Sequence, residues 1–192
     1  RSVKLAVNYS RRYSDSFRKL KVYLDSGGIG EIQAIRGFYT KGLKHNGSHW
    51  VDLLRFLTGE VELMSVLSAT ESAEPDPTLD VMYRMSGGGI AVLQGLDHKN
   101  FSLFEMDIVG TKGRVKIEDS GHCFSVYDVV PSKWYEGYFT LELANNQIEG
   151  GMRDVTLNAV ENLIDAVQGK SDLKCSGQQA LQAILLTDLT AS

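Results

Sequence analysis

The chain of 192 residues is long enough for one large domain, and its 43% hydrophobic and 23% charged residues are ordinary for a globular protein. Its net charge of -4 argues against a nucleic-acid partner, because binding to phosphates requires a basic face. No apolar run approaches the ~20 residues of a membrane span, and the polar N-terminus does not resemble a signal peptide. The two cysteines, Cys123 and Cys175, stand far apart and outside any CxxC motif, which predicts structural thiols in a reducing, cytoplasmic compartment.

The beginning of the chain predicts a strand, a helix and a glycine turn. The short, β-rich run VKLAVNY at residues 3–9 predicts the strand. Apolar residues then repeat at helical spacing, at Phe17, Leu20, Tyr23 and Leu24. Ser14 or Asp15 can cap this helix, and Gly27 is placed to end it.

A second strand is predicted at residues 31–42, EIQAIRGFYTKG, followed by an amphipathic helix. Its apolar positions follow the i, i+3, i+4, i+7 pattern, at Trp50, Leu53, Leu54 and Leu57. Gly59 closes this helix. Asn46 or Ser48 is the expected N-cap, which leaves His45 in the preceding loop.

Residues 61 to about 130 predict successive strands of an antiparallel sheet. Apolar and polar residues alternate in FEMDI at 104–108 and in RVKIE at 114–118, which indicates a sheet with one face open to solvent. The stretches SGGG and GTKG sit where hairpin turns belong. Residues 131–150 read as irregular and aromatic.

Two helices are predicted at the end of the chain. The first has its apolar residues at Val160, Leu163, Ile164 and Val167. The second starts with a capping box, Ser176 and Gln179, and continues through Leu181, Ile184 and Leu185. The whole layout predicts an α+β fold: a large, mostly antiparallel sheet with helices on one face. The other face of the sheet is a candidate subunit interface, which predicts a homo-oligomer.

The pair His45 and His49 is the first candidate site. In an unbroken helix these residues and Asp52 would share a face, as in a two-histidine, one-carboxylate metal set. Gly47 discourages a helix there, and Asn46 stands where a metalloprotease helix carries glutamate, so we expect no metal. In the first turn of a helix, His49 would be kept neutral and able to exchange a proton near pH 7. The alternative is a half-buried packing histidine.

The stretch YSRRY, Tyr9 to Tyr13, is the second candidate. Two adjacent arginines after the C-terminal end of a strand suit an anionic or polyhydroxyl ligand, and a solvated pair of charges is the alternative. The glycine stretches at 27–30 and 86–89 match no phosphate-binding motif and read as a helix stop and a hairpin.

The order of these motifs resembles the Gfo/Idh/MocA family, the glucose-fructose oxidoreductase and inositol dehydrogenase group. The family's Y-x-R-R-F/Y run with its S-G-x-I-G-E-I ending is matched by YSRRYSDSFRKLKVYLDSGGIGEI, residues 9–32. Its G-x-H-x-x-D-L-L-R-x-L-x-G motif is matched at residues 47–59, and its G-T-x-G turn at 110–117. The last residues, NLIDAVQGKSDLKCSGQQALQAI, also fit the family's closing helices, so the resemblance covers nearly the whole chain.

The resemblance implies a protein in two parts, a Rossmann domain for NAD or NADP followed by an α/β domain on an open mixed sheet. Residues 1–28 would be the last strand and helix of the first domain, and 29–192 the substrate-binding and oligomerisation domain. The dinucleotide fingerprint and the family's Glu-Lys-Pro motif have no counterpart here. The resemblance therefore implies that the chain is the C-terminal domain of an NAD(P)-dependent oxidoreductase and is inactive by itself.

The resemblance also implies roles for individual residues. His49 matches the histidine that works beside the hydride-transfer site, so a catalytic role is implied for it. Substrate contacts are implied for His45, Arg12, Tyr13 and Asn46, and cofactor contacts for Arg11 and Tyr9. Many members carry aspartate where this chain has His45, a departure that indicates a different sugar. The implied substrate is a sugar, nucleotide sugar or polyol; the alternative is a non-catalytic dimerisation and ligand-binding scaffold.

Overall fold

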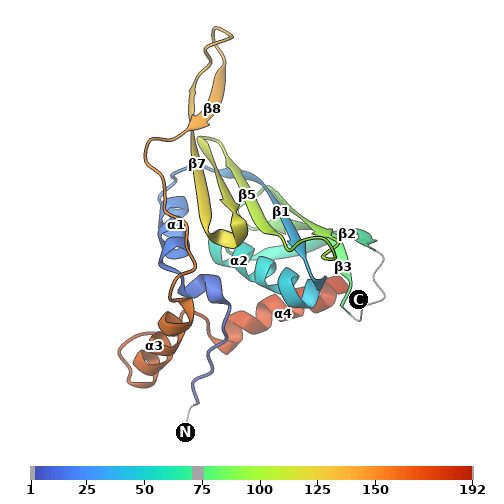
Figure 1. The fold of residues 1–192 in the computed structure, drawn as a ribbon, viewed down its shortest axis with the longest axis vertical. Coiled ribbons are helices and arrows are strands. Elements are labelled where there is room, and N and C mark those ends of the chain that lie inside the picture. The colour runs from blue at the N-terminus through green and yellow to red at the C-terminus, as the bar shows by residue number, and fades with distance from the viewer. Residues whose placement is uncertain (1–2, 71–75, 192) are drawn as a thin grey trace.

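The computed structural model describes residues 3–70 and 76–191. Its centre is an eight-stranded mixed sheet in the order β2-β3-β4-β1-β5-β6-β7-β8 (Figure 1). β1 and β4 are parallel neighbours, and the other adjacent strands pair antiparallel. The strands are β1 (Ile32–Thr40), β2 (Val61–Thr70), β3 (Thr78–Met85), β4 (Ile90–Leu96), β5 (Phe104–Gly110), β6 (Gly113–Glu118), β7 (Cys123–Pro131) and β8 (Phe139–Leu143). This confirms the predicted fold class, including the hairpin turns at SGGG and GTKG.

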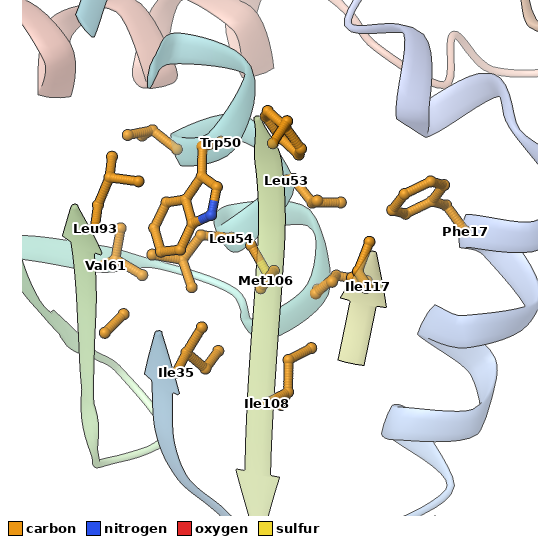
Figure 2. Close-up of a cluster of buried hydrophobic side chains, with 14 of the residues drawn as sticks. Phe17, Ile35, Trp50, Leu53, Leu54, Val61, Leu93, Met106, Ile108 and Ile117 are labelled. Atoms are coloured by element: carbon orange, nitrogen blue, oxygen red, sulfur yellow. The ribbon is translucent and has the colours of Figure 1, made fainter. Parts of the chain in front are cut away.

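The core lies between the sheet and the helices α1 (Asp15–Asp25) and α2 (Ser48–Thr58), with α4 (Gly177–Ala191) packed against α2. The predicted apolar stripe of α2 is buried, and Trp50 has no exposed surface. Its indole Nε1 donates a hydrogen bond to the Glu105 carbonyl at 3.2 Å, and its ring covers Gly37 of β1. Figure 2 shows Trp50, Leu53 and Leu54 facing the strands beside Phe17 of α1. Among the described residues, no helix is long and apolar enough to cross a membrane.

Residues 3–9 do not form the predicted strand. The segment makes one isolated bridge, between Ala6 and Ser176, flanked by backbone hydrogen bonds that join Val7 to Cys175 and Leu5 to Gly177. A β-rich run needs a partner along its length, and the structure offers it only this short stretch. A 3₁₀ turn, η1, follows at Ser10–Tyr13, and the Ser14 hydroxyl then caps α1 by accepting from the Phe17 amide at 3.3 Å. A domain boundary at residue 28 stays a prediction.

The helix that carries the histidines begins earlier than predicted. A π-helical turn, Gly42–Gly47, runs directly into α2, so His45 is helical and neither Asn46 nor Ser48 is an N-cap. The cap comes instead from Asp76, whose carboxylate accepts from the backbone amides of Lys44 and His45 at 2.8 and 2.9 Å. Since this cap lies about thirty residues away, the local sequence does not reveal it.

The end of the sheet carries a strand that was not predicted. β8 pairs with β7, and the two strands extend beyond the body of the molecule as an arm (Figure 1). The side chains at its tip are strongly exposed, at Trp134, Tyr135, Tyr138 and Phe139. The sequence of β8, FTLEL, does alternate apolar and polar residues, a strand signal that the sequence analysis missed, although Phe139, Leu141 and Leu143 all remain exposed.

The last two helices form as predicted, but their apolar stripes do not face the core. In α3 (Val155–Val167) the buried residues are Asn162 and Ala166, whereas Val160 and Ile164 are about half exposed. Asn162 braces the next loop through hydrogen bonds to Asp172 and Lys174. α4 buries Ala180, Ala183, Leu186, Thr187 and Thr190 and exposes Leu181, Ile184 and Leu185. The predicted capping box is present, since the Ser176 and Gln179 side chains each accept from the other's backbone amide.

Candidate functional site

His49 lies on α2 near the C-terminal end of β1, because the chain passes from Thr40 almost directly into the helical turn that precedes α2. Its imidazole is half-buried and meets the Tyr9 ring edge-on, with the two ring centroids 5.0 Å apart. Burial, and then the positive charges of Arg11 and His45, lower the His49 pKa to about 4. The side chain is therefore neutral near pH 7, able to accept or donate a proton.

The neutral state of His49 was expected, but its cause differs from the prediction. Since helical backbone begins at Gly42, His49 stands more than a turn inside the helix and not at its N-terminus. The dipole effect fades within the first turn, so burial and neighbouring cations act in its place. The sequence also gave no sign of Tyr9 as the ring contact of His49, because the two are forty residues apart.

Arg12 and Asp52 form a buried ion pair beneath the histidine. Arg12 Nε donates to both carboxylate oxygens, at 3.0 Å to Oδ1 and 2.9 Å to Oδ2, and the side chains are only 7% and 2% exposed. Burial raises the pKa of the Asp52 carboxyl, and the Arg12 guanidinium offsets part of that rise. The pair holds η1 against α2, a role that sequence reasoning missed for both residues. A substrate contact for Arg12 stays a prediction.

Tyr13 is also inside the protein. It is 1% exposed, and its hydroxyl donates to the Val7 carbonyl at 3.1 Å. Its backbone carbonyl accepts from the Asn158 side chain, which ties η1 to α3. These contacts give Tyr13 a structural role, and its predicted substrate contact remains untested.

Arg11 points to a different environment from its neighbour Arg12. Its guanidinium carbon lies 3.4 Å from the centroid of the Phe104 ring, at the start of β5. Nη2 donates to the Ser120 carbonyl at 3.2 Å, and the buried Nε has no hydrogen-bond partner among the described residues. Burial lowers the Arg11 pKa to about 10, so the side chain is still a cation at neutral pH.

His45 and Asn46 occupy the π-helical turn before α2. His45 is exposed, Asn46 is half-buried, and His45 stands one turn before His49. Arg11 and His45 lie close enough to His49 to lower its pKa, and Tyr9 contacts the His49 ring. Tyr9, at 6% exposed, is buried like Arg12 and Tyr13, which support the site from inside. Within the described ranges no three histidine, cysteine or acidic residues are grouped to hold a metal ion, and the Asp52 carboxylate is bound to Arg12.

The shifted pKa of His49 predicts how stability depends on pH. Between its ordinary pKa of 6.5 and about 4, the unfolded chain binds a proton at this residue and the folded chain does not. The contribution of His49 to stability is therefore complete above pH 6.5 and is lost as the pH falls toward 4, by up to about 3 kcal/mol. Urea unfolding at a series of pH values measures how the free energy of unfolding depends on pH. In His49→Gln this free energy should fall less between pH 6.5 and 4 than in the parent chain. His122→Gln, at an exposed histidine, should follow the parent chain; identical profiles for the two variants would contradict the prediction.

Known structures share this fold. The chain matches levoglucosan dehydrogenase in complex with NADH and levoglucosan (TM-score 0.76, 15% identity, 97% of this chain and 63% of that one). It also matches the WlbA dehydrogenase of Bordetella pertussis in complex with NADH and UDP-GlcNAcA (TM-score 0.73, 18% identity, 98% of this chain and 61% of that one). A third match is an oxidoreductase of Agrobacterium radiobacter in complex with NAD⁺, L-tartaric acid and magnesium (TM-score 0.70, 18% identity, 98% of this chain and 62% of that one).

These neighbours are oxidoreductases of the Gfo/Idh/MocA type, so the fold agrees with the resemblance seen in the motifs. The chain spans about three-fifths of the length of the solved structures that it matches. No protein-family model and no curated protein matches its sequence. At identities of 15–18%, the comparison establishes the shared fold.

Proposed function

We propose that this chain is the substrate-binding domain of an NAD(P)-dependent oxidoreductase that acts on a sugar, nucleotide sugar or polyol. The observation that carries the proposal is the shared fold with dehydrogenases solved in complex with NADH. The site adds a neutral His49 beside an arginine, near the C-terminal ends of the parallel strands β1 and β4, where ligands of open α/β sheets bind.

In this proposal His49 handles the proton of the reaction. Its neutral imidazole accepts the hydroxyl proton of an alcohol substrate, or returns it to a carbonyl in the reverse direction. The bound nicotinamide supplies the hydride chemistry. His45 and Asn46 contact the substrate from the turn before α2, and Tyr9 is the cofactor contact. The Arg12–Asp52 pair holds the turn that carries Arg11 against the helix that carries His49.

The described residues do not form a cradle for a whole dinucleotide. Gly27 ends α1 and Gly88 turns the β3–β4 hairpin, each with a positive φ, and neither precedes a helix N-terminus as a phosphate loop does. The proposal therefore assigns most cofactor contacts to a Rossmann domain outside this chain. The exposed apolar stripes of α3 and α4 are surfaces for such a domain, with Val160 51% and Leu185 52% exposed.

Titration calorimetry with NADH and NADPH tests whether the cofactor site lies in another domain. We expect no binding to this chain and micromolar binding to a longer protein in which a dinucleotide-binding domain precedes it. Binding to neither protein would favour the scaffold alternative, a module for dimerisation and ligand binding without chemistry. Tight binding to this chain alone would contradict the assignment of the cofactor site to another domain.

Replacing His49 with alanine in that longer protein should lower kcat by about 10²- to 10⁴-fold, because proton transfer loses its positioned group. Steady-state rates of NAD(P) reduction over a panel of sugars give the measurement. The control is His122→Ala, since His122 is exposed and stands before β7. A His49→Ala enzyme with unchanged kcat would support the scaffold alternative instead.

We also propose that the face of the sheet opposite α2 binds a second copy of the chain. This face carries Ile90 and Val92 of β4 and Val109 of β5, with Arg36 of β1 and Asp107 of β5 among them. Val92→Lys should convert a dimer into a monomer in sedimentation velocity, because a charge would be buried without a partner. The control Val22→Lys adds the same charge to α1, where Val22 is 68% exposed, and should leave the mass unchanged. A wild-type chain that sediments as a monomer at high concentration would refute the interface.

A further inference from the structure

Arg11 is a partly buried cation that no carboxylate contacts directly among the described residues; the Asp52 carboxylate, which raises the Arg11 pKa, is bound to Arg12. Its neighbour Arg12 is neutralised by Asp52, and Arg55 on the same helix as His49 is paired with Glu60 at 2.6 Å. Among the described residues Arg11 makes no ion pair, and its one side-chain hydrogen bond goes to a neutral carbonyl. Its Nε is buried without a partner. An arrangement of this kind is unfavourable for stability, because burying a guanidinium requires compensation by hydrogen bonds and an anion.

Stacking on a ring and one hydrogen bond to a carbonyl fix the position of the Arg11 side chain, and among the described residues no ion pair contributes. The guanidinium carbon lies 3.4 Å from the centroid of the Phe104 ring, and Phe104 is itself 3% exposed. The Ser120 carbonyl accepts a hydrogen bond from Nη2. An apolar side chain would fill the same place on the ring without an unpaired donor. Part of Arg11 remains accessible to solvent, so a ligand can reach it. Arginine is also the side chain best suited to bind a planar oxyanion through parallel hydrogen bonds.

Arg11 lies beside the group that the proposed function uses for proton transfer. The ring of Tyr9, two residues before Arg11, meets the His49 ring at 5.0 Å between centroids, and the charge of Arg11 lowers the His49 pKa more than that of His45 does. A group bound by Arg11 would therefore be part of the molecule whose hydroxyl meets His49. The nicotinamide ring carries no anion. The phosphates of a dinucleotide are held by glycine-rich loops and free helix N-termini, whereas the helix start at this site, Gly42–Gly47, is already capped by the Asp76 carboxylate.

We propose that Arg11 binds a carboxylate of the substrate, which makes the substrate a sugar acid and not a neutral sugar. This inference rests on the proposed function for the identity of the reacting partner, and it departs from the cofactor contact that the motif implies for Arg11. The oxyanion accepts hydrogen bonds from the accessible part of the guanidinium and supplies an anion bonded directly to it, which the free protein lacks among its described residues. The unfavourable burial of Arg11 in the free protein is then the consequence of a side chain placed for binding.

The test uses the chain itself, with D-glucuronate, D-glucose and inorganic phosphate as probes at constant ionic strength. NMR titration follows the imidazole resonances of His49 and the amides of residues 9–13. We expect glucuronate to shift these resonances and to raise the His49 pKa, and glucose to do neither. Arg11→Met should weaken glucuronate binding about 10- to 100-fold, the usual effect of losing a charge-assisted hydrogen bond. Arg11→Lys should recover part of the affinity.

The matched control is Arg36→Met. Arg36 also stacks on an aromatic ring, at 5.0 Å from the Phe38 centroid, but it lies on the open face of the sheet and is hydrogen-bonded to Gln94. Arg36→Met should bind glucuronate like the parent chain. Thermal unfolding gives a second readout: Arg11→Met should melt at the same temperature as the parent or higher, whereas a structural role for Arg11 would lower it.

Three results would overturn the inference: equal shifts by glucose and glucuronate, unchanged glucuronate binding in Arg11→Met, or tighter Arg11-dependent binding of phosphate, which would assign the residue to a cofactor. The experiment also separates the two proposals. If glucuronate binding depends on Arg11 but the longer protein reduces no NAD(P), the carboxylate site is supported and the proposed oxidoreductase function is refuted. Oxidation of a neutral sugar at a rate insensitive to Arg11→Met would do the reverse.

Discussion

Asp52→Ala is expected to lower the free energy of unfolding by about 3–5 kcal/mol, because it leaves the Arg12 guanidinium buried without its counter-ion. Arg12 is 7% exposed, and its Nε donates to both oxygens of this carboxylate. Stacking near the Phe56 ring, at 5.2 Å, does not replace an anion. Urea unfolding followed by circular dichroism at neutral pH measures the loss.

The control for Asp52→Ala is Asp15→Ala, which breaks the ion pair between Asp15 and Arg18 on the surface of α1. Asp15 is 67% exposed, and surface pairs of this kind contribute about 0–1 kcal/mol. The double variant Arg12→Met/Asp52→Leu should recover most of the stability, because it removes both buried charges together. Equal losses for Asp52→Ala and Asp15→Ala would mean that the buried pair is not a stabilising unit.

Gly37→Ala is expected to lower the free energy of unfolding by about 3 kcal/mol, the upper end of the range for overpacking a core. A β-carbon at Gly37 would stand 2.0 Å from Nε1 of Trp50 and 2.2 Å from Cε2, the nearest carbon of the six-membered ring. The indole cannot easily move aside, since it is fully buried and donates to the Glu105 carbonyl. Denaturation of Gly37→Ala against the parent chain gives the measurement.

Gly87→Ala is the matched control for Gly37→Ala. Gly87 lies in the β3–β4 turn, its backbone does not require positive φ, and an added β-carbon would meet nothing within 4 Å. Its effect should stay within about 0.5 kcal/mol. Adding Trp50→Leu to Gly37→Ala tests the cause directly, because the second change makes room for the methyl group. Losses that simply add in the double variant would show that the indole is not the obstacle.

Local sequence patterns predicted much of the fold. The spacing of Trp50, Leu53, Leu54 and Leu57 correctly gave the buried face of α2. Alternation in FEMDI and RVKIE correctly placed Met106 and Ile117 in the core, and Ser176 and Gln179 form the expected capping box. Each of these signals depends on residues within one or two turns or along one strand, so a single stretch of sequence contains all the information.

The predictions that failed concern elements whose neighbours are distant in sequence. α4 presents Ala180 and Ala183 to the core instead of Leu181 and Ile184, because small residues allow the helix to pack closely on α2. The first helical turn before α2 is capped by Asp76 from the loop before β3, and within the described part of the chain residues 3–9 make only one bridge, between Ala6 and Ser176. Propensity and periodicity describe an isolated segment, and tertiary packing overrides them where a partner is present or missing.

The candidate site divides in the same way. The motifs around His49 and around the two arginines were visible in the sequence, because their residue types and spacings are local. Only the tertiary structure decided what each side chain does there: Asp52 neutralises Arg12 from forty residues away, Phe104 supports Arg11, and burial lowers the His49 pKa. Charge state and hydrogen-bond partners depend on which atoms surround a group in space, and those atoms come from η1, α2 and β5 only after the chain has folded.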